Sequence, residues 1–399
     1  ANFEIPACRS IYFAALDEND LSVKQMRSFV TAQPGERVSC IGCHENRTVT
    51  SRADLGPRLA YQRAPSRILP FAGIPDILDF PRDIQPILDR HCVSCHDITN
   101  RKGVLVLSGD RGPTYSLAYY NLLLHRQIQD SAGRNWEGIR NIGGRPGGND
   151  APYSAFSFAA PLMKYIGKSH YDVGLSETER TTIRLWLDSA TPYAGTAAAI
   201  GTGQIGGWWR NNEPVREMAD AWPTTGPAKD AIQRRCATCH ESRLPRFVTD
   251  RTSGDPYNDF EGWERPVSRF SRHTILNLTH PDLSLALTVP LAKSAGGFAE
   301  GPLTKPAPVP NDLAHAPKPV VHGVVFGSTD DPDYQAILAH LQAARDRLDE
   351  IKRFDMPGFK PAAEYLREMK RYGVLPAEFD AEKVTTQVDF AASGRKGRP

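Results

Sequence analysis

The chain has 399 residues, with 48 Lys and Arg against 46 Asp and Glu, and 32 each of Gly and Pro. A nearly balanced charge argues against nucleic acid or an acidic membrane surface as the main partner. No apolar run approaches the roughly 18 residues of a transmembrane segment. Because Gly and Pro interrupt regular structure, we expect a mainly α fold with short helices, loop-rich segments and a small N-terminal β-hairpin.

The hairpin is predicted within residues 11–30. Two short apolar runs, 11–16 and 21–30, flank a polar turn at Asp17–Asp20. An isolated hairpin is only marginally stable. We therefore expect it to pack on the rest of the chain or to pair its strand edge with another chain.

A Cys-x-x-Cys-His motif follows the hairpin at Cys40–His44 and recurs at Cys92–His96 and Cys236–His240. This is the attachment signature of c-type haem, in which two thiols bond the porphyrin and the histidine ligates the iron. A zinc ribbon does not require the histidine, and a thioredoxin-like dithiol needs one such pair near a βαβ unit. The sequence predicts three covalently bound c-type haems. The thioether residues are Cys40, Cys43, Cys92, Cys95, Cys236 and Cys239, and the proximal iron ligands are His44, His96 and His240.

The motifs use six of the seven cysteines and leave Cys8, for which we expect a buried or half-buried thiol; pairing with another chain or capping a haem edge is the alternative. Covalent haem is attached outside the cytoplasm. We therefore expect an extracytoplasmic protein, periplasmic or extracellular, from which a signal peptide has been removed before Ala1.

Helices are predicted next to the second motif. After a Pro-rich link, residues 83–90 form a short helix that delivers Cys92 and Cys95. Ser176 with Glu179 three residues later is a capping box, which begins a helix with an apolar body near Trp186. This arrangement is typical of a small cytochrome c fold.

The C-terminal half begins after a Gly/Ala-rich linker at 195–207. Asp331 and Pro332 predict the start of a long amphipathic helix, and a last helix spans about 361–372. We expect an N-terminal β segment with haem 1 at 1–62, a cytochrome c-like domain with haem 2 at 63–200, and a second cytochrome c-like domain with haem 3 at 201–399.

Eight stretches of the chain resemble the haem-bearing C-terminal half of hydrazine-synthase alpha-subunit-like proteins, which are multihaem cytochromes. They are Phe13–Asp17, Met26–Ser28, Pro34–Glu36, Cys40–Glu45, Asp83–Cys92, Asn277–Pro281, Pro290–Lys293 and Asp355–Phe359. The family carries a β-propeller ahead of this region, and the chain begins after it. The resemblance also implies a tyrosine four residues after one motif histidine, but Asn100 follows His96 at that spacing. This difference speaks against hydrazine synthesis.

The sixth iron positions decide between function classes, since His/Met ligation raises the reduction potential and bis-His ligation keeps it lower. For haem 2 we favour His170, in the loop before the capped helix, over Met163. For haem 3 we favour His322 over Met356, because the resemblance implies two histidines there. For haem 1 His91 is favoured by adjacency alone, with His125 and Met26 as alternatives.

Extracytoplasmic electron transfer is the function that the motifs favour, with redox partner proteins or copies of the chain itself as partners. Strand pairing between copies would build a filament. The alternative is a haem redox enzyme acting on a small nitrogen species at one five-coordinate haem. The resemblance gives His280 a place near a haem propionate. The same role is open to Arg27, Arg47 and Arg145, which more often are ordinary surface or loop arginines.

Overall fold

The computed structural model describes most of the chain. The described residues are 2–26, 28–38, 59–113, 115–125, 127–128, 151–196, 222–240, 275–303, 322–353, 355–357, 359 and 363–379. The first Cys-x-x-Cys-His motif, at 40–44, lies outside them, as do Arg27, Arg47 and Arg145.

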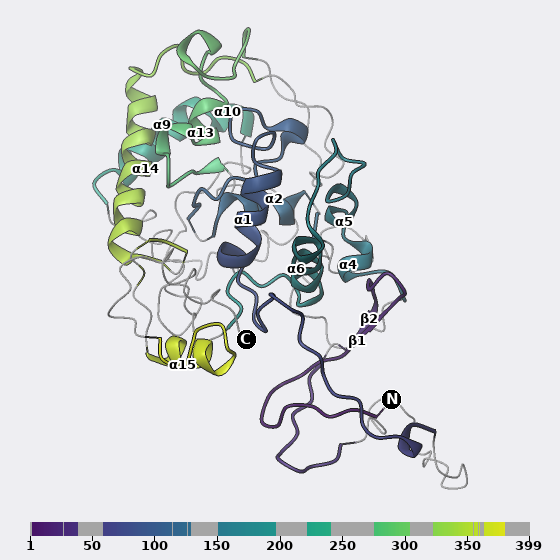
Figure 1. Cartoon of the computed structure of the whole chain (residues 1–399). Helices are drawn as coiled ribbons and strands as arrows, with labels where there is room; N and C mark the ends of the chain where they lie inside the picture. Colours follow the sequence, from purple (N-terminus) through teal and green to yellow (C-terminus); the bar gives the residue numbers. More distant parts are fainter. Residues whose placement is uncertain are drawn as a thin grey trace, which may run out of the picture.

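The described part combines a helical body with an N-terminal arm that extends away from it (Figure 1). Loops make up much of the body, in agreement with the Gly and Pro content. Its strands are β1 (Ala14–Leu16) and β2 (Ser22–Gln25), and its helices are α1 (Gln85–His91), α2 (Leu117–Leu124), α4 (Phe156–Ala159), α5 (Leu162–Tyr165), α6 (Glu177–Asp188), α9 (Thr225–Arg235), α10 (Ala237–His240), α13 (Leu285–Thr288), α14 (Pro332–Ile351) and α15 (Ala363–Arg371).

The predicted hairpin is confirmed, although its strands are shorter than the apolar runs. β1 and β2 pair antiparallel, with Ala14 opposite Gln25. The turn holds because the Asp17 carboxylate accepts the backbone N–H groups of Asn19 and Leu21 at 2.9 and 2.8 Å, and because Asp20 adopts a left-handed φ of 60°. Aspartate tolerates that conformation better than most residues.

One edge of the hairpin packs on the body within the same chain. The Ser22 N–H donates to Ser157 Oγ at 3.0 Å, and Val23 O accepts the Tyr153 N–H at 2.9 Å. The Gln25 side chain reaches the Asp188 carbonyl, also at 2.9 Å. The β2 edge is therefore engaged by the segment around α4 and α6, and β1, whose three residues are exposed, forms the outer edge.

The expectation for Cys8 is wrong, because its side chain is exposed. It lies on the N-terminal arm, where its Sγ is 3.7 Å from Gln33 Oε1. The arm projects from the body, so that few apolar neighbours cover its side chains (Figure 1).

The first hydrophobic cluster is built around α1, α2 and α6. Phe80 lies at its centre, fully buried, with ring centroids 5.2 Å from Tyr119 and 5.3 Å from Trp186. The predicted capping box at the start of α6 is confirmed, since Ser176 and Glu179 exchange side chain-to-backbone hydrogen bonds. The cap fixes where α6 begins and thereby aligns its apolar face with α1.

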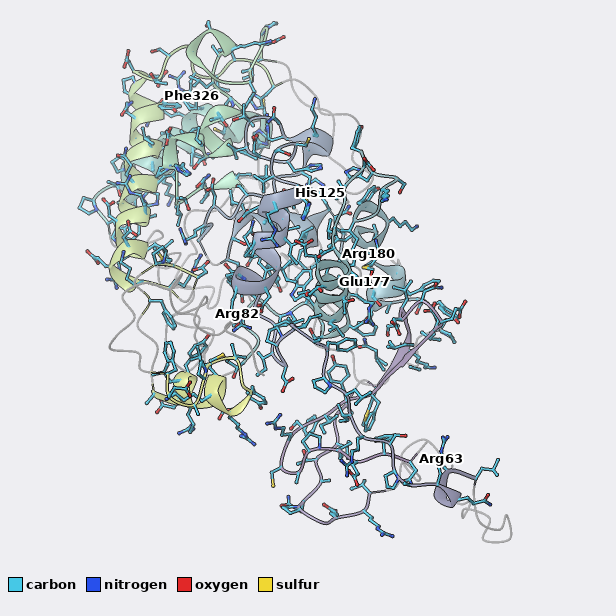
Figure 2. All side chains as sticks on the ribbon, viewed as in Figure 1. Arg63, Arg82, His125, Glu177, Arg180 and Phe326 are labelled. Carbon is cyan, nitrogen blue, oxygen red and sulfur yellow. The ribbon has the colours of Figure 1, made fainter. Side chains whose placement is uncertain are left out.

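A second hydrophobic cluster joins α9, α13 and α14. The predicted start of α14 is confirmed, because the Asp331 carboxylate accepts the N–H groups of Asp333 and Tyr334 in its first turn. Phe326 is fully buried in this cluster. Figure 2 shows Phe326 among these C-terminal elements, Arg82 and His125 in the middle of the body, and Arg63 on the N-terminal arm.

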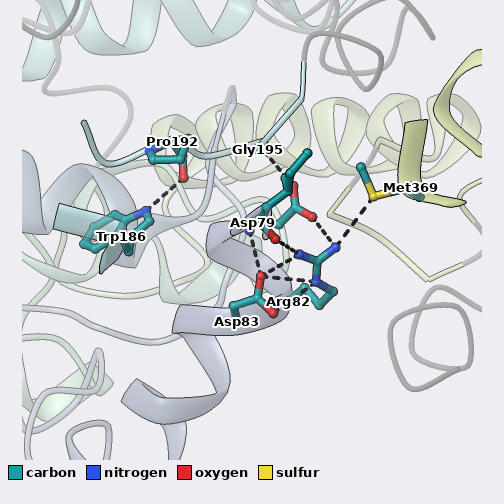
Figure 3. A network of polar contacts seen from close by, with 8 residues as sticks. Asp79, Arg82, Asp83, Trp186, Pro192, Gly195 and Met369 are labelled. Carbon is teal, nitrogen blue, oxygen red and sulfur yellow. Dashed lines mark hydrogen bonds and ion pairs between the residues drawn. The ribbon is translucent and has the colours of Figure 1, made fainter. Parts of the chain in front are cut away.

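Helix α15, although last in the chain, packs on the first cluster through Tyr365 and Met369. A buried ion network lies beside this contact (Figure 3). Arg82 pairs with Asp79 and Asp83 at 2.5 and 2.7 Å. Asp79 also accepts the Gly195 N–H at 2.7 Å. The C-terminal segment thus contributes to a core formed by residues 78–193, and the boundary expected near residue 200 stays a prediction.

Candidate haem sites

The second motif follows α1 directly. The Cys92 N–H donates to Leu88 O at 2.8 Å, which continues the helical hydrogen bonding to the first cysteine, and the His96 N–H donates to Cys92 O at 3.0 Å. This tight turn places both thiols and the imidazole on one short segment. Burial raises the pKa of the Cys92 thiol to about 11, as expected for a group packed against the apolar cluster.

His170 is brought beside His96 from the loop between α5 and α6. The centroids of the two imidazole rings are 6.2 Å apart, and the ring planes differ by 15°. A turn that is closed by the His170 N–H on Gly167 O at 3.1 Å holds the loop, and the Tyr165 ring contacts His170 edge-on at 5.1 Å. The two histidines are too far apart for direct stacking, although their planes are nearly parallel.

The third motif repeats this arrangement. Helix α9 ends at Arg235, just before Cys236, and the His240 N–H donates to Cys236 O at 3.0 Å. The rings of His240 and His322 have centroids 6.1 Å apart and planes within 8°. His322 Nδ1 lies 2.6 Å from Gly323 O. Because a carbonyl can only accept, Nδ1 carries the hydrogen and Nε2 keeps its lone pair for a metal.

Both ring separations fit two axial ligands of one iron. A metal–imidazole bond is about 2 Å long, and ring bonds of about 1.33 Å put each nitrogen about 1.1 Å from its ring centre. Imidazoles on opposite sides of one metal therefore have centroids about 6 Å apart. Among the residues that the structure describes, no group of three or more His, Cys, Asp or Glu side chains could hold a bare metal ion. The ring separations would let the two imidazoles of each pair hold one metal between them.

The alternative ligands stay predictions, and the structure places them as follows. Met163 packs at the margin of the first cluster, and Met356 is buried in the second. Met26 is partly exposed on the N-terminal arm. The pKa of His125 is lowered to about 4 by burial, which keeps its imidazole neutral. None of these replaces His170 or His322 in the ring pairs described above.

His91 contacts α6. Its Nε2 is 3.2 Å from Glu179 Oε1, and its proposed role at haem 1 stays a prediction because the first motif is outside the described residues. His280 Nδ1 lies 3.3 Å from Asp110 Oδ1, and its place near a propionate is likewise untested.

Asn100 has a local structural role. Its side-chain amide donates to Asp97 Oδ2 at 2.9 Å and to Ser94 O at 3.2 Å. These bonds brace the loop that carries the second motif. An amide held in this way is engaged within the loop and does not substitute for the tyrosine expected from the resemblance.

A buried polar network links residues of the first hydrophobic cluster to the segment that follows α14. The Arg353 guanidinium donates to both Asp355 oxygens at 2.8 Å and to the carbonyls of Gly112 and Pro113. Tyr193, from the first cluster, donates its hydroxyl to Asp355. Burial alone would raise the pKa of Asp355, but the adjacent Arg353 lowers it below its usual range.

Glu179 is expected to make stability depend on pH. Burial alone would raise its pKa, but hydrogen bonds from Arg90, Ser176 and His91 lower the pKa from 4.5 to about 2. A carboxylate with a depressed folded-state pKa stabilises the fold above its unfolded-state pKa, and this contribution is lost as pH falls from 4.5 toward 2. Since Arg90 is half-exposed, we expect a contribution of about 1 kcal/mol.

The measurement is chemical denaturation at several pH values. Glu179→Gln should be less stable than wild type at neutral pH and should lose stability less steeply between pH 4.5 and 2. Glu177→Gln, in the same helical turn but exposed, is the matched control and should follow the wild type. Parallel curves for Glu179→Gln and wild type would contradict the assignment.

The sequence motifs do not point to Gly323. Its role is visible only in the structure, where backbone atoms of Pro302 and Leu303 approach it closely. A Cβ at this position would lie 2.5 Å from Pro302 O and 2.5 Å from Leu303 Cα. Gly323→Ala should therefore displace His322 and convert part of one low-spin haem to high spin, as read by electron paramagnetic resonance (EPR). Gly327→Ala, where a Cβ meets no atom within 4 Å, should leave the spectrum unchanged. Equal spectra for both variants would argue against this role.

Comparison with known proteins supports a partial relationship to one family. Residues 1–45 match the hydrazine synthase alpha subunit middle domain. Hydrazine synthase subunit alpha of Kuenenia stuttgartiensis is 32% identical over 128 residues, which cover 28% of this chain and 15% of that protein. No solved structure matches the chain significantly. The chain is thus related in part to hydrazine synthase alpha, and it spans a small fraction of that relative's length.

Within the described ranges, no helix is both long enough and apolar enough to cross a membrane.

Proposed function

We propose that the chain is a c-type cytochrome with three covalently attached haems that transfers electrons outside the cytoplasm. The observation that carries the proposal is that two pairs of histidines have nearly parallel rings, with centroids 6.2 and 6.1 Å apart. One histidine of each pair belongs to a Cys-x-x-Cys-His motif. Bound haem supplies a one-electron Fe(III)/Fe(II) couple at each site. The chain supplies the thiols for attachment and two imidazoles that close the iron against substrates.

Closed iron sites favour electron transfer over catalysis, because a haem enzyme needs an open coordination position. Two of the three proposed haems have a histidine on each side. The network of Arg353, Asp355 and Tyr193 links the first hydrophobic cluster to the segment that follows α14. A fixed geometry suits electron transfer, which needs neither substrate access nor domain movement.

The test is low-temperature EPR of the oxidised, haem-loaded protein together with a haem count. We expect three haems per chain and low-spin signals from at least the two sites whose histidine pairs are described. A haem count other than three, or high-spin iron at either of these sites, would overturn the proposal.

A second candidate function is redox chemistry on a small nitrogen species. It is favoured by the match of residues 1–45, which contain the first motif, to a hydrazine synthase domain. The open haem would then be the first one, at Cys40–His44. This function requires a high-spin signal from one iron and a spectral shift on addition of cyanide or nitric oxide; a fully low-spin, unreactive protein excludes it.

Assembly into a filament is the finer part of the proposal. Its support is the outer edge of β1, with three exposed residues, and large exposed side chains on the arm such as Phe29, Leu59 and Leu69. An unpaired strand edge is a template for another strand. Negative-stain microscopy of the haem-loaded protein should show polymers; monomers at all concentrations would remove this part.

A further inference from the structure

Arg101 follows the second motif and places its guanidinium over the ring of Phe298. Its guanidinium carbon lies 4.0 Å from the ring centroid of Phe298. Its backbone has a left-handed φ of 39°, a conformation that is strained for a residue with a Cβ. The loop holds it there through the Arg101 N–H on Asp97 O at 3.0 Å and the Lys102 N–H on Cys95 O at 3.1 Å.

Phe298 connects this contact to the third haem site. Two residues further on, the Glu300 N–H donates to His322 O at 3.0 Å. Arg101 thus lies where the loop after His96 meets the segment beside His322. The Arg101 guanidinium therefore lies between the surroundings of the two histidine pairs.

The charge of Arg101 has no carboxylate partner among the described residues. Partial burial lowers its pKa, and no acid offsets that effect. Two acids lie close in sequence to this contact, Asp97 before Arg101 and Glu300 after Phe298, and both have other partners. Asp97 accepts from Asn100, and Glu300 pairs with Lys293 at 2.5 Å. Charged groups that lose water are normally paired, so a partly buried guanidinium with no carboxylate among the described residues is suited to bind an anion.

We propose that Arg101 binds a haem propionate at the border between the two histidine pairs and raises the reduction potential of that haem. The inference rests on the proposed function, because the propionate belongs to a haem that must be attached there. A guanidinium matches a carboxylate in a bidentate geometry. A positive charge near the iron disfavours Fe(III) relative to Fe(II), so its removal should lower the potential.

The test is a spectroelectrochemical titration of the haem-loaded protein. Arg101→Gln should lower the midpoint potential of one haem and leave the haem count unchanged, and Arg101→Lys should retain most of the wild-type value. Lys102→Gln removes an exposed positive charge from the adjacent position and should change the potentials less. Identical titration curves for wild type and Arg101→Gln would overturn the inference.

An experimental structure of the haem-loaded wild type provides the second measurement, which does not depend on any variant. We expect the guanidinium within about 3 Å of a propionate oxygen, and the haem that carries this oxygen identifies which site it is. An Arg101 guanidinium beyond hydrogen-bond reach of every haem propionate would overturn the inference. Failure of the proposed function is distinguishable, because it shows as absent or high-spin haem in the wild type before any variant is compared.

Discussion

Replacing His170 with alanine should open one iron and convert one of the three proposed haems from low spin to high spin. His170 is the histidine whose ring centroid lies 6.2 Å from that of His96. The alanine variant keeps Cys92, Cys95 and His96, so the haem should remain attached. The oxidised protein should then show a high-spin EPR signal and bind cyanide or added imidazole at that iron. His322→Ala should do the same at the third site, where the centroid distance is 6.1 Å.

Lys168→Ala is the control. Lys168 is exposed in the same loop, two residues before His170, and its replacement should leave the low-spin spectrum unaltered. If His170→Ala keeps a wild-type spectrum, another residue such as Met163 closes the iron. If added imidazole restores the low-spin signal, the lost ligand was an imidazole on that face.

Replacing Arg353 with methionine should be the most destabilising single change in the described part of the chain. The side chains of Arg353 and Asp355 are only 1% and 3% exposed. Methionine has a similar length but no charge, so the buried Asp355 carboxylate loses the guanidinium that pairs with both of its oxygens. Arg111, which donates to the Asp355 carbonyl, is then the remaining cation nearby. Breaking a buried ion pair in this way costs about 3–5 kcal/mol. Denaturant unfolding of the haem-loaded protein, followed by circular dichroism, measures the loss.

Two further variants separate the buried charge from other effects. Arg353→Met with Asp355→Asn should be more stable than Arg353→Met alone, because no unpaired charge remains. Arg345→Met removes an arginine from an exposed ion pair on α14, in which the N–O distance to Asp346 is 2.7 Å. This variant should lower the free energy of unfolding by at most about 1 kcal/mol. Equal losses for Arg345→Met and Arg353→Met would contradict the role assigned to the network.

Local sequence signals predicted the elements next to the motifs well. The capping box at Ser176 and Glu179 and the N-cap at Asp331 were visible because a helix start depends on residues within one turn. The hairpin was visible from its apolar runs, but its strands ended earlier than expected. Strand length depends on which residues find partners, here Tyr153 and Ser157 beyond the hairpin itself.

The buried networks were not visible in the sequence. Asp79 and Arg82 stand three residues apart, a spacing that allows an ion pair, but nothing in the sequence indicates that Gly195 joins them. Helix α15 likewise reaches the first cluster from the far end of the chain. The exposure of Cys8 was missed for the same reason. Burial is a property of the surrounding fold. The backbone at Cys8 contacts the end of α15, since the Arg371 guanidinium donates to the Cys8 carbonyl at 3.1 Å, but the thiol itself remains exposed.

The sequence by itself determined the attachment chemistry that we propose, because the two cysteines and the histidine of each motif lie within five residues and their spacing alone sets which atoms meet one porphyrin. Chain position and the resemblance favoured His170 and His322 as partners but left Met163 and Met356 open. Only the tertiary structure decided which side chains lie beside His96 and His240. His170 and His322 are far along the chain from His96 and His240, and their ring pairs form through packing of separate helices and loops. Contacts between distant residues depend on the whole fold, and no local pattern encodes them.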